Sequence, residues 1–325
     1  MSTSALRAPM IPISRRVRAY FAPVNRATGV AAVFDPAKYG TFDLELPPSP
    51  WIDLGWIANL RRSAATRFEL LRSGSKGGAS AQARAGLEAR LEFDFREWGK
   101  LQMALAGGSQ HMNVLAADGN SDAVGSGGTA LSGVAVLPGS TATEILFGTG
   151  AVDAFAVGDV LAIDADYQQQ TGYVGSPIAG AYVRTPIDVL LDASYLRRVT
   201  FNVGRVAAKT ASSVLLAQPL VGGAPVANAN AQKIIAFVDR EGGSFFQEWS
   251  ALFVVEEDTG GRICFHYPRL QPTTPAGEQK FEILPGIEGY SLHGSFLALP
   301  QRDVNDNEQV LCYRSYFPAS NSALY

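Results

Sequence analysis

Residues 87–95 alternate strictly between apolar and charged side chains, and no other stretch of the chain constrains the fold as tightly. The apolar members of the pattern are Leu87, Ala89, Leu91, Phe93 and Phe95. Side chains of a β-strand point to opposite faces in turn, so a period of two predicts a strand with one buried face. Any fold for this chain must therefore supply a core for one side of an antiparallel sheet.

Short apolar runs bounded by turn residues predict further strands along the chain. They are residues 51–57, 66–72, 233–238, 249–255, 262–267, 282–284, 290–299 and 310–316. The 33 glycines and 18 prolines favour many turns over long helices. Because 47% of the residues are hydrophobic and 18% charged, the composition is that of a globular protein. We expect a mainly β fold.

One segment changes from the strand period to the helix period. After Phe95, the side chains of Trp98, Leu101 and Leu105 recur at helical spacing, and Gly107 and Gly108 supply a stop signal. The sequence therefore predicts one α-helix over residues 96–106. Trp98, Leu101 and Leu105 are expected to form its buried face.

A Gly/Ser/Ala-rich stretch, residues 73–86, separates two of the predicted strands. A hairpin turn needs only about two to five residues, so this stretch is far longer than the connection requires. We expect a long functional loop at this position.

Two low-complexity segments, residues 116–133 and 222–231, bracket the middle of the chain. Between them, turn residues separate short apolar runs at 144–147, 160–163, 172–174, 180–183, 198–203 and 213–216. This pattern predicts an inserted small β-barrel-like domain over residues 129–232. Residues 33–128 and 233–325 would then form one discontinuous β domain.

The first 32 residues contain five arginines and little periodicity. This composition favours an N-terminal arm, residues 1–32, that becomes ordered only against a partner.

The net charge of −3 conceals an uneven distribution of charge. When the chain is divided after residues 125 and 235, the three parts carry net charges of +4, −1 and −6. In a protein that assembles with itself, a basic surface can meet an acidic one head to tail. Solvated faces with no role in assembly explain the same asymmetry.

None of the motifs GxSxG, GxGxxG, GxxxxGK[ST], HExxH or CxxC occurs in the sequence. Cys264 and His266 share one strand face, but packing explains them better than metal ligation, and both cysteines are expected as unpaired thiols. A solvated acidic turn accounts for residues 256–258, and a turn leaving the helix accounts for residues 110–113. We expect no enzyme, no cofactor and no metal site.

No run approaches 18 apolar residues, and the first residues show no apolar leader. The sequence therefore predicts neither a membrane span nor a cleaved signal, and synthesis in the cytoplasm.

Three features in this order resemble the tail tube proteins, the major tail proteins of tailed bacteriophages. They are the two strands that flank residues 73–86, the strand that runs into the helix over residues 93–106, and the later hairpin over residues 249–267. The resemblance covers residues 40–115 and 235–316.

The resemblance implies a β-sandwich flanked by one α-helix, whose subunits form rings that stack into a hollow tube for double-stranded DNA. After the insert is subtracted, the chain has the length of one tube domain, which favours hexameric rings. Residues 73–86 would be the loop that reaches the next ring, with contacts from Ser73, Gly74, Lys76, Gly77, Gly78, Gln82 and Arg84. The implied place is the virion, with other tail proteins at the tube ends and the insert on the tube exterior.

DNA must slide through such a tube without being held, which an acidic or neutral lining permits. The acidic final part of the chain can supply that lining through Glu256, Glu257, Asp258, Glu278, Glu282 and Glu288. A solvated outer face explains these acids as well. The alternative function is a secreted or surface β protein that binds or hydrolyses carbohydrate, which would use a carboxylate pair in an aromatic cleft.

Overall fold

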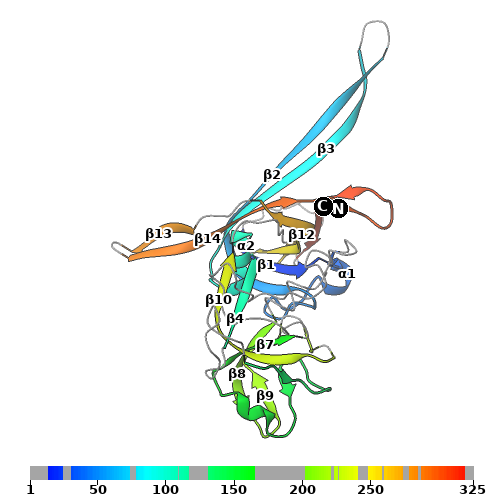
Figure 1. The fold of residues 1–325 in the computed structure, drawn as a ribbon. Helices are drawn as coiled ribbons and strands as arrows, with labels where there is room; N and C mark the ends of the chain where they lie inside the picture. The colour runs from blue at the N-terminus through cyan, green and yellow to red at the C-terminus, as the bar shows by residue number, and fades with distance from the viewer. Residues whose placement is uncertain are drawn as a thin grey trace, which may run out of the picture. The chain divides into compact units, whose positions relative to one another are not determined.

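Two groups of antiparallel strands make up most of the computed structural model, and each group belongs to its own unit (Figure 1). Unit 1 comprises residues 1–24, 30–108 and 246–325, and unit 2 comprises residues 25–29 and 109–245. The structure describes residues 14–24, 31–73, 78–108, 110–116, 131–164, 202–220, 223–225, 227–240, 248–257, 260–273, 278–284 and 287–318. The mainly β fold class predicted from the sequence is confirmed.

Unit 1 is built around one eight-stranded sheet with the order β13-β14-β3-β2-β1-β11-β12-β17. Its strands are β1 (Ser14–Pro23), β2 (Ile52–Ser73), β3 (Gly78–Phe95), β11 (Trp249–Glu257), β12 (Arg262–Pro272), β13 (Glu278–Leu284), β14 (Ile287–Ala298) and β17 (Tyr313–Phe317). The unit also contains α1 (Pro36–Tyr39), α2 (Lys100–Gly107) and a small hairpin of β15 (Gln301–Arg302) and β16 (Gln309–Val310).

A second pairing of β14 closes this sheet into a barrel. Residues 296–298 of β14 pair with β3 on one side and with residues 270–272 of β12 on the other. The strands β14, β3, β2, β1, β11 and β12 therefore form a closed antiparallel circuit. Closure satisfies backbone groups that an open sheet would leave at its edges.

Aromatic side chains fill the interior of the barrel. Phe21, Phe93, Phe253 and Phe296 come from four different strands, and the centroids of their contacting rings lie 5.2–6.5 Å apart. Phe93 and Phe296 stack with an interplanar angle of 9°. A Cβ on Gly294 would approach the ring of Phe296 to 2.6 Å, so only glycine leaves room for this stack.

The predicted alternation of residues 87–95 is observed in β3. Ala89, Leu91, Phe93 and Phe95 are buried in the barrel, and Glu88, Arg90 and Glu92 between them are exposed.

β1 and β11 are buried on both faces. Residues 19–22 of β1 and 251–254 of β11 are fully buried, although neighbouring side chains point to opposite sides of the sheet. One face of each strand lies in the barrel, and the other packs with Phe34, Leu44 and Trp51 from the segment 31–51. This double burial explains why residues 249–255 read as a continuous apolar run.

The expectation of an N-terminal arm over residues 1–32 is wrong for residues 14–23. They form β1, which lies between β2 and β11 in the sheet, with Tyr20 and Phe21 in the two cores. Of the arginines that suggested an arm, Arg15, Arg16 and Arg18 lie on β1, where Arg18 is buried against Asp53. Residues 1–13 and 25–30 lie outside the described part of the chain.

The predicted helix begins later than its hydrophobic spacing indicated. The N–H of Arg96 donates to the carbonyl of Trp56, so this residue still extends the sheet, and α2 begins only at Lys100. Leu101 and Leu105 are buried as predicted, and the left-handed Gly108 ends the helix. Trp98 precedes the helix and is 48% exposed, so its assignment to the buried face is wrong.

Unit 2 has its own sheet and its own core. Its strands are β4 (Gln110–Leu115), β5 (Val134–Ala135), β6 (Glu144–Leu146), β7 (Val160–Asp164), β8 (Val203–Lys209), β9 (Ser213–Leu216) and β10 (Asn230–Arg240), with a 3-10 helix η1 at Ala151–Ala154. They follow the order β4-β10-β7-β8-β9-β6, and β5 also pairs with β10. Ile145, Phe147, Leu161 and Val214 are among the residues of the buried core.

Unit 2 is larger than the insert expected over residues 129–232. It begins at Ser109 and ends at Phe245, because β10 pairs with β4 on one side and with β7 on the other. Residues 110–113, expected as a turn, are therefore part of a strand. The strands expected at 172–174 and 180–183 lie outside the described residues, as does most of the one expected at 198–203.

Two of the four tryptophans, Trp249 and Trp98, give a direct test of where the core lies. Trp249→Ala removes a fully buried ring beside Phe21, and truncating a buried Trp costs roughly 3–5 kcal/mol. Trp98→Ala removes a half-exposed ring, and we expect a loss of about 1 kcal/mol or less. Denaturant unfolding measures both values. Equal losses for the two variants would contradict this assignment of the core.

Candidate assembly surface

The hairpin of β2 and β3 continues far beyond the barrel (Figure 1). β2 pairs with β1 only as far as Ile57, and β3 pairs with β14 only from Ala89 onward. Between these points and the turn, the two strands pair only with each other, in a register that reaches Ser73 opposite Gly78. From Ala65 to Ser73 this two-stranded part is roughly 26 Å long, at about 3.3 Å per residue.

The projecting part of the hairpin exposes large apolar side chains. Every residue from Arg61 to Arg72 is exposed except Thr66, which is half-buried. Phe68, Leu70 and Leu71 are 51–56% exposed. Phe68 and Leu70 lie on one face because they are two residues apart, and Gln82 joins them opposite Leu70.

A hairpin of this kind has little to stabilise it alone. A two-stranded ladder without a covered face is marginally stable in water, and each large apolar side chain gains about 1.5–3 kcal/mol from full burial. Among the described residues, no third strand pairs with the ladder beyond Ala65 and Glu88. A partner that covers Phe68 and Leu70 would therefore stabilise the hairpin. We name the exposed residues Arg67–Arg72 with Gln82 the hairpin surface.

The expected long loop over residues 73–86 is wrong in its extent. Residues 78–86 belong to β3 and pair with residues 67–73 of β2, leaving only 74–77 between the strands. Two register shifts, beside Arg67 and beside Arg72, accommodate the small residues that suggested a loop. Of the predicted contact residues, Ser73, Gly78, Gln82 and Arg84 lie on the ladder, and Gly74, Lys76 and Gly77 lie outside the described residues.

A polar cluster lies where the hairpin leaves the barrel. The strands shift register between Ala58 and Arg61, and Asn59 adopts a left-handed backbone with φ of 55°. Its side-chain amide donates to Asp94 at 2.6 Å, and the other oxygen of Asp94 lies 2.7 Å from Nδ1 of His293. These contacts join β2, β3 and β14 at the base of the projection.

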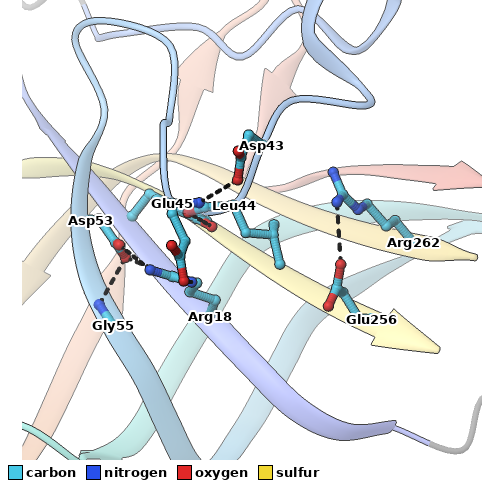
Figure 2. A network of polar contacts seen from close by, with 9 residues as sticks. Arg18, Asp43, Leu44, Glu45, Asp53, Gly55, Glu256 and Arg262 are labelled. Atoms are coloured by element: carbon cyan, nitrogen blue, oxygen red, sulfur yellow. Dashed lines mark hydrogen bonds and ion pairs between the residues drawn. The ribbon is translucent and has the colours of Figure 1, made fainter. Parts of the chain in front are cut away.

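A second polar network attaches the segment 31–51 to the outside of the barrel (Figure 2). Arg18 donates through two nitrogens to Asp53 and lies 5.2 Å from the ring centroid of Trp56. The hydrogen bond to Asp53 raises the pKa of Arg18. Tyr20 donates to the carbonyl of Leu44 at 2.8 Å. The Arg18 contacts join β1 to β2, and the Tyr20 hydrogen bond fixes the segment against β1.

A comparison with models of protein families finds none that matches the chain, and a comparison with curated proteins finds no significant match. The argument for function therefore depends on the residues themselves.

The acids predicted to line a channel fall into two groups. Glu256 is on β11, where Arg262 donates to it at 3.2 Å beside the segment 31–51 (Figure 2), so it does not belong to a solvated turn. Glu257, Glu278, Glu282 and Glu288 lie on strands, but their side chains are outside the described part of the structure, as is all of Asp258. The lining stays a prediction for this set.

Cys264 and His266 share one buried face of β12, as the sequence indicated. Burial raises the pKa of the Cys264 thiol to about 12, and neither Cys264 nor Cys312 forms a disulfide. Nε2 of His266 lies 3.1 Å from both the Ala32 carbonyl and Ser250 Oγ. Because the carbonyl only accepts, Nε2 carries the proton of the neutral ring.

Among the described residues, no group of three or more His, Cys, Asp or Glu side chains could hold a metal ion. Within the same ranges, no helix is long and apolar enough to cross a bilayer.

His266 predicts an acid-dependent loss of stability. Burial lowers its folded-state pKa from 6.5 to about 4, so the unfolded chain takes up a proton first as the pH falls. The native state should lose about 3 kcal/mol relative to the unfolded state between pH 6.5 and pH 4. The His266→Gln variant lacks this contribution. The difference in unfolding free energy between the wild type and the variant should therefore shrink as the pH falls from 6.5 to 4. Denaturant unfolding of both proteins at several pH values measures this difference. A difference that stays constant with pH would contradict the prediction.

Proposed function

We propose that this chain is a structural protein of a bacteriophage tail, which forms rings that stack into the tube for DNA delivery. The observation that carries the proposal is the hairpin surface. A two-stranded ladder roughly 26 Å long with exposed Phe68 and Leu70 gains stability when another surface covers it. The closed barrel of unit 1 supplies a rigid base for such a projection.

The two edges of the unit 1 sheet support the formation of rings. β13 is at one end of the sheet and β17 at the other, and each has one side without a partner strand among the described residues. When β13 of one copy pairs with β17 of the next, the contact is head to tail, and it generates a ring if the rotation closes. We propose hexameric rings of this kind, with unit 2 on the exterior and the acids of the last 90 residues toward the channel.

Shortening the hairpin tests stacking. We expect that a variant with residues 67–86 replaced by a two-residue Asn-Gly turn folds, because the described residues of that range pair only with each other. It should form rings but no tubes. Electron microscopy and circular dichroism of the purified chain measure both properties. Tubes of normal length from this variant would refute stacking through the hairpin, and single particles from the wild type would favour the carbohydrate-binding alternative.

Proline substitutions in the edge strand test ring closure. Successive N–H groups of β13 alternate between β14 and the open edge, so Gln279→Pro and Lys280→Pro remove donors on opposite sides. We expect the variant that loses the outward donor to keep its fold and lose ring formation. The other variant should weaken the β13–β14 hairpin itself. Rings from both variants, seen by microscopy, would exclude β13 from the ring contact.

A further inference from the structure

A pocket in unit 2 lies over the outer face of the strands β5 and β10. It has a volume of about 550 Å³, and pockets for small ligands typically measure roughly 300–1,000 Å³. Ala135 of β5 pairs with Asn230 of β10, and both residues line the pocket. Their neighbours Val134 and Ala231 pack in the core of the unit. Because side chains alternate between the faces of a strand, the pocket is on the side opposite the core. We call it the unit 2 pocket.

Hydrogen bonds within unit 2 fix the walls of this pocket. The hydroxyl of Ser140 donates to the Leu137 carbonyl at 2.8 Å and accepts from the N–H of Leu146 at 2.9 Å. The N–H of Val136 donates to the Ala229 carbonyl at 2.9 Å, which joins one wall to the other. The unit therefore forms the pocket by itself, and a ligand would not have to order it first.

Two side-chain amides in the lining are free to bond a ligand. Asn228 and Asn230 both line the pocket, and neither side chain has a hydrogen-bond partner among the described residues. Asn228 is exposed and Asn230 is half-buried. Each amide offers two N–H donors and one acceptor oxygen. A matching ligand must therefore both donate and accept hydrogen bonds.

The lining disfavours a charged ligand. None of the described residues that line the unit 2 pocket carries a charge. A charged group placed there would lose water without gaining an opposite charge, which costs free energy. Leu137 and Pro138 instead contribute apolar surface, and Leu137 is 43% exposed. The pocket therefore suits a neutral molecule that has both an apolar face and several hydrogen-bonding groups.

Neutral saccharides and uncharged peptides both fit that description, and the backbone of the pocket distinguishes them. A peptide that adds to a sheet bonds mainly to the backbone of a free strand edge. Here the N–H of Leu137 already donates to the Leu146 carbonyl at 2.8 Å, and the N–H of Val136 is bonded to Ala229. The free groups are side-chain amides, which suit the adjacent hydroxyls of a sugar ring. The C–H face of the same ring suits the apolar wall.

We propose that the unit 2 pocket binds a neutral saccharide. Asn228 and Asn230 bond to adjacent hydroxyls of one sugar ring, and Leu137 and Pro138 lie against its C–H face. This site goes beyond the proposed function, because the proposed rings and their stacking use unit 1. It assigns to unit 2 the binding of a glycan and no cleavage of it.

Saturation-transfer difference NMR of the full-length chain tests binding. The probes are glucose, galactose, mannose and N-acetylglucosamine at millimolar concentration. We expect saturation of the ring protons of at least one of these neutral sugars. Each sugar that binds is then compared with its 6-phosphate, which should bind more weakly because the lining offers it no opposite charge. Equal binding of the phosphate would contradict the selection of a neutral ligand.

Substitutions of the two amides show whether the signal comes from the pocket. Asn228→Gly removes one amide and keeps a residue that adopts the positive φ of this position, and Asn230→Ala removes the other amide. Each lost hydrogen bond should weaken binding about twofold to tenfold in a titration. Asn307→Gly is a matched control, because Asn307 is also an exposed asparagine with a φ of 62° but lies in unit 1. We expect this control to bind as the wild type does.

The outcomes separate this inference from the proposed function. Tubes from a wild type that binds none of the four sugars would overturn the saccharide site and leave the tube function standing. Sugar binding by a wild type that remains as single particles would support the site and count against the tube. Sugar binding that is unchanged in both asparagine variants would overturn the site. Saturation of tetra-alanine in place of the sugars, reduced in those variants, would assign the pocket to peptides and refute the saccharide.

Discussion

The pairing of β12 with β14 turns an open sheet into a barrel, and the other features of unit 1 depend on that closure. Residues 296–298 bond to a strand on each side, so the backbone of β14 is satisfied at the point where the sheet would otherwise end. The phenylalanines of four strands then meet in one interior. Because they interlock, losing one ring disturbs its contacts with several strands.

A barrel closed in this way leaves its outer face to be covered by other means. Over β1 and β11 the cover is the segment 31–51, held by the hydrogen bond from Tyr20 to the Leu44 carbonyl and by the ring contact between Tyr20 and Phe42. The buried Arg18 donates two charge-assisted hydrogen bonds to Asp53. These hydrogen bonds offset the cost of removing the guanidinium group from water. The Arg18–Asp53 contact therefore joins β1 to β2, whereas the Tyr20 hydrogen bond joins the barrel to its cover.

The hairpin of β2 and β3 combines a rigid base with an incomplete end. Its base shares the barrel core through Phe93 and Phe95, and the contacts of Asn59, Asp94 and His293 lie where the strands leave the barrel. Among the described residues, no third strand pairs with its outer part, and the side chains of residues 67–72 are exposed. A protein can maintain such a projection when the core elsewhere supplies the stability, and the projection then gains its missing contacts from a partner.

Local patterns in the sequence determined the mainly β class, the buried face of β3, the end of α2 at Gly108 and the buried thiol of Cys264. Each depends on neighbours a few residues apart or on the chemistry of a single side chain. Only the tertiary structure decided that residues 14–23 are a central strand, that residues 78–86 extend a ladder and that Trp98 precedes its helix. These outcomes depend on pairing with distant strands, which local periodicity does not encode. The pocket on unit 1 that residues 31–36, His266 and residues 301–305 line is of the same kind, because its walls come from segments more than 200 residues apart in the chain.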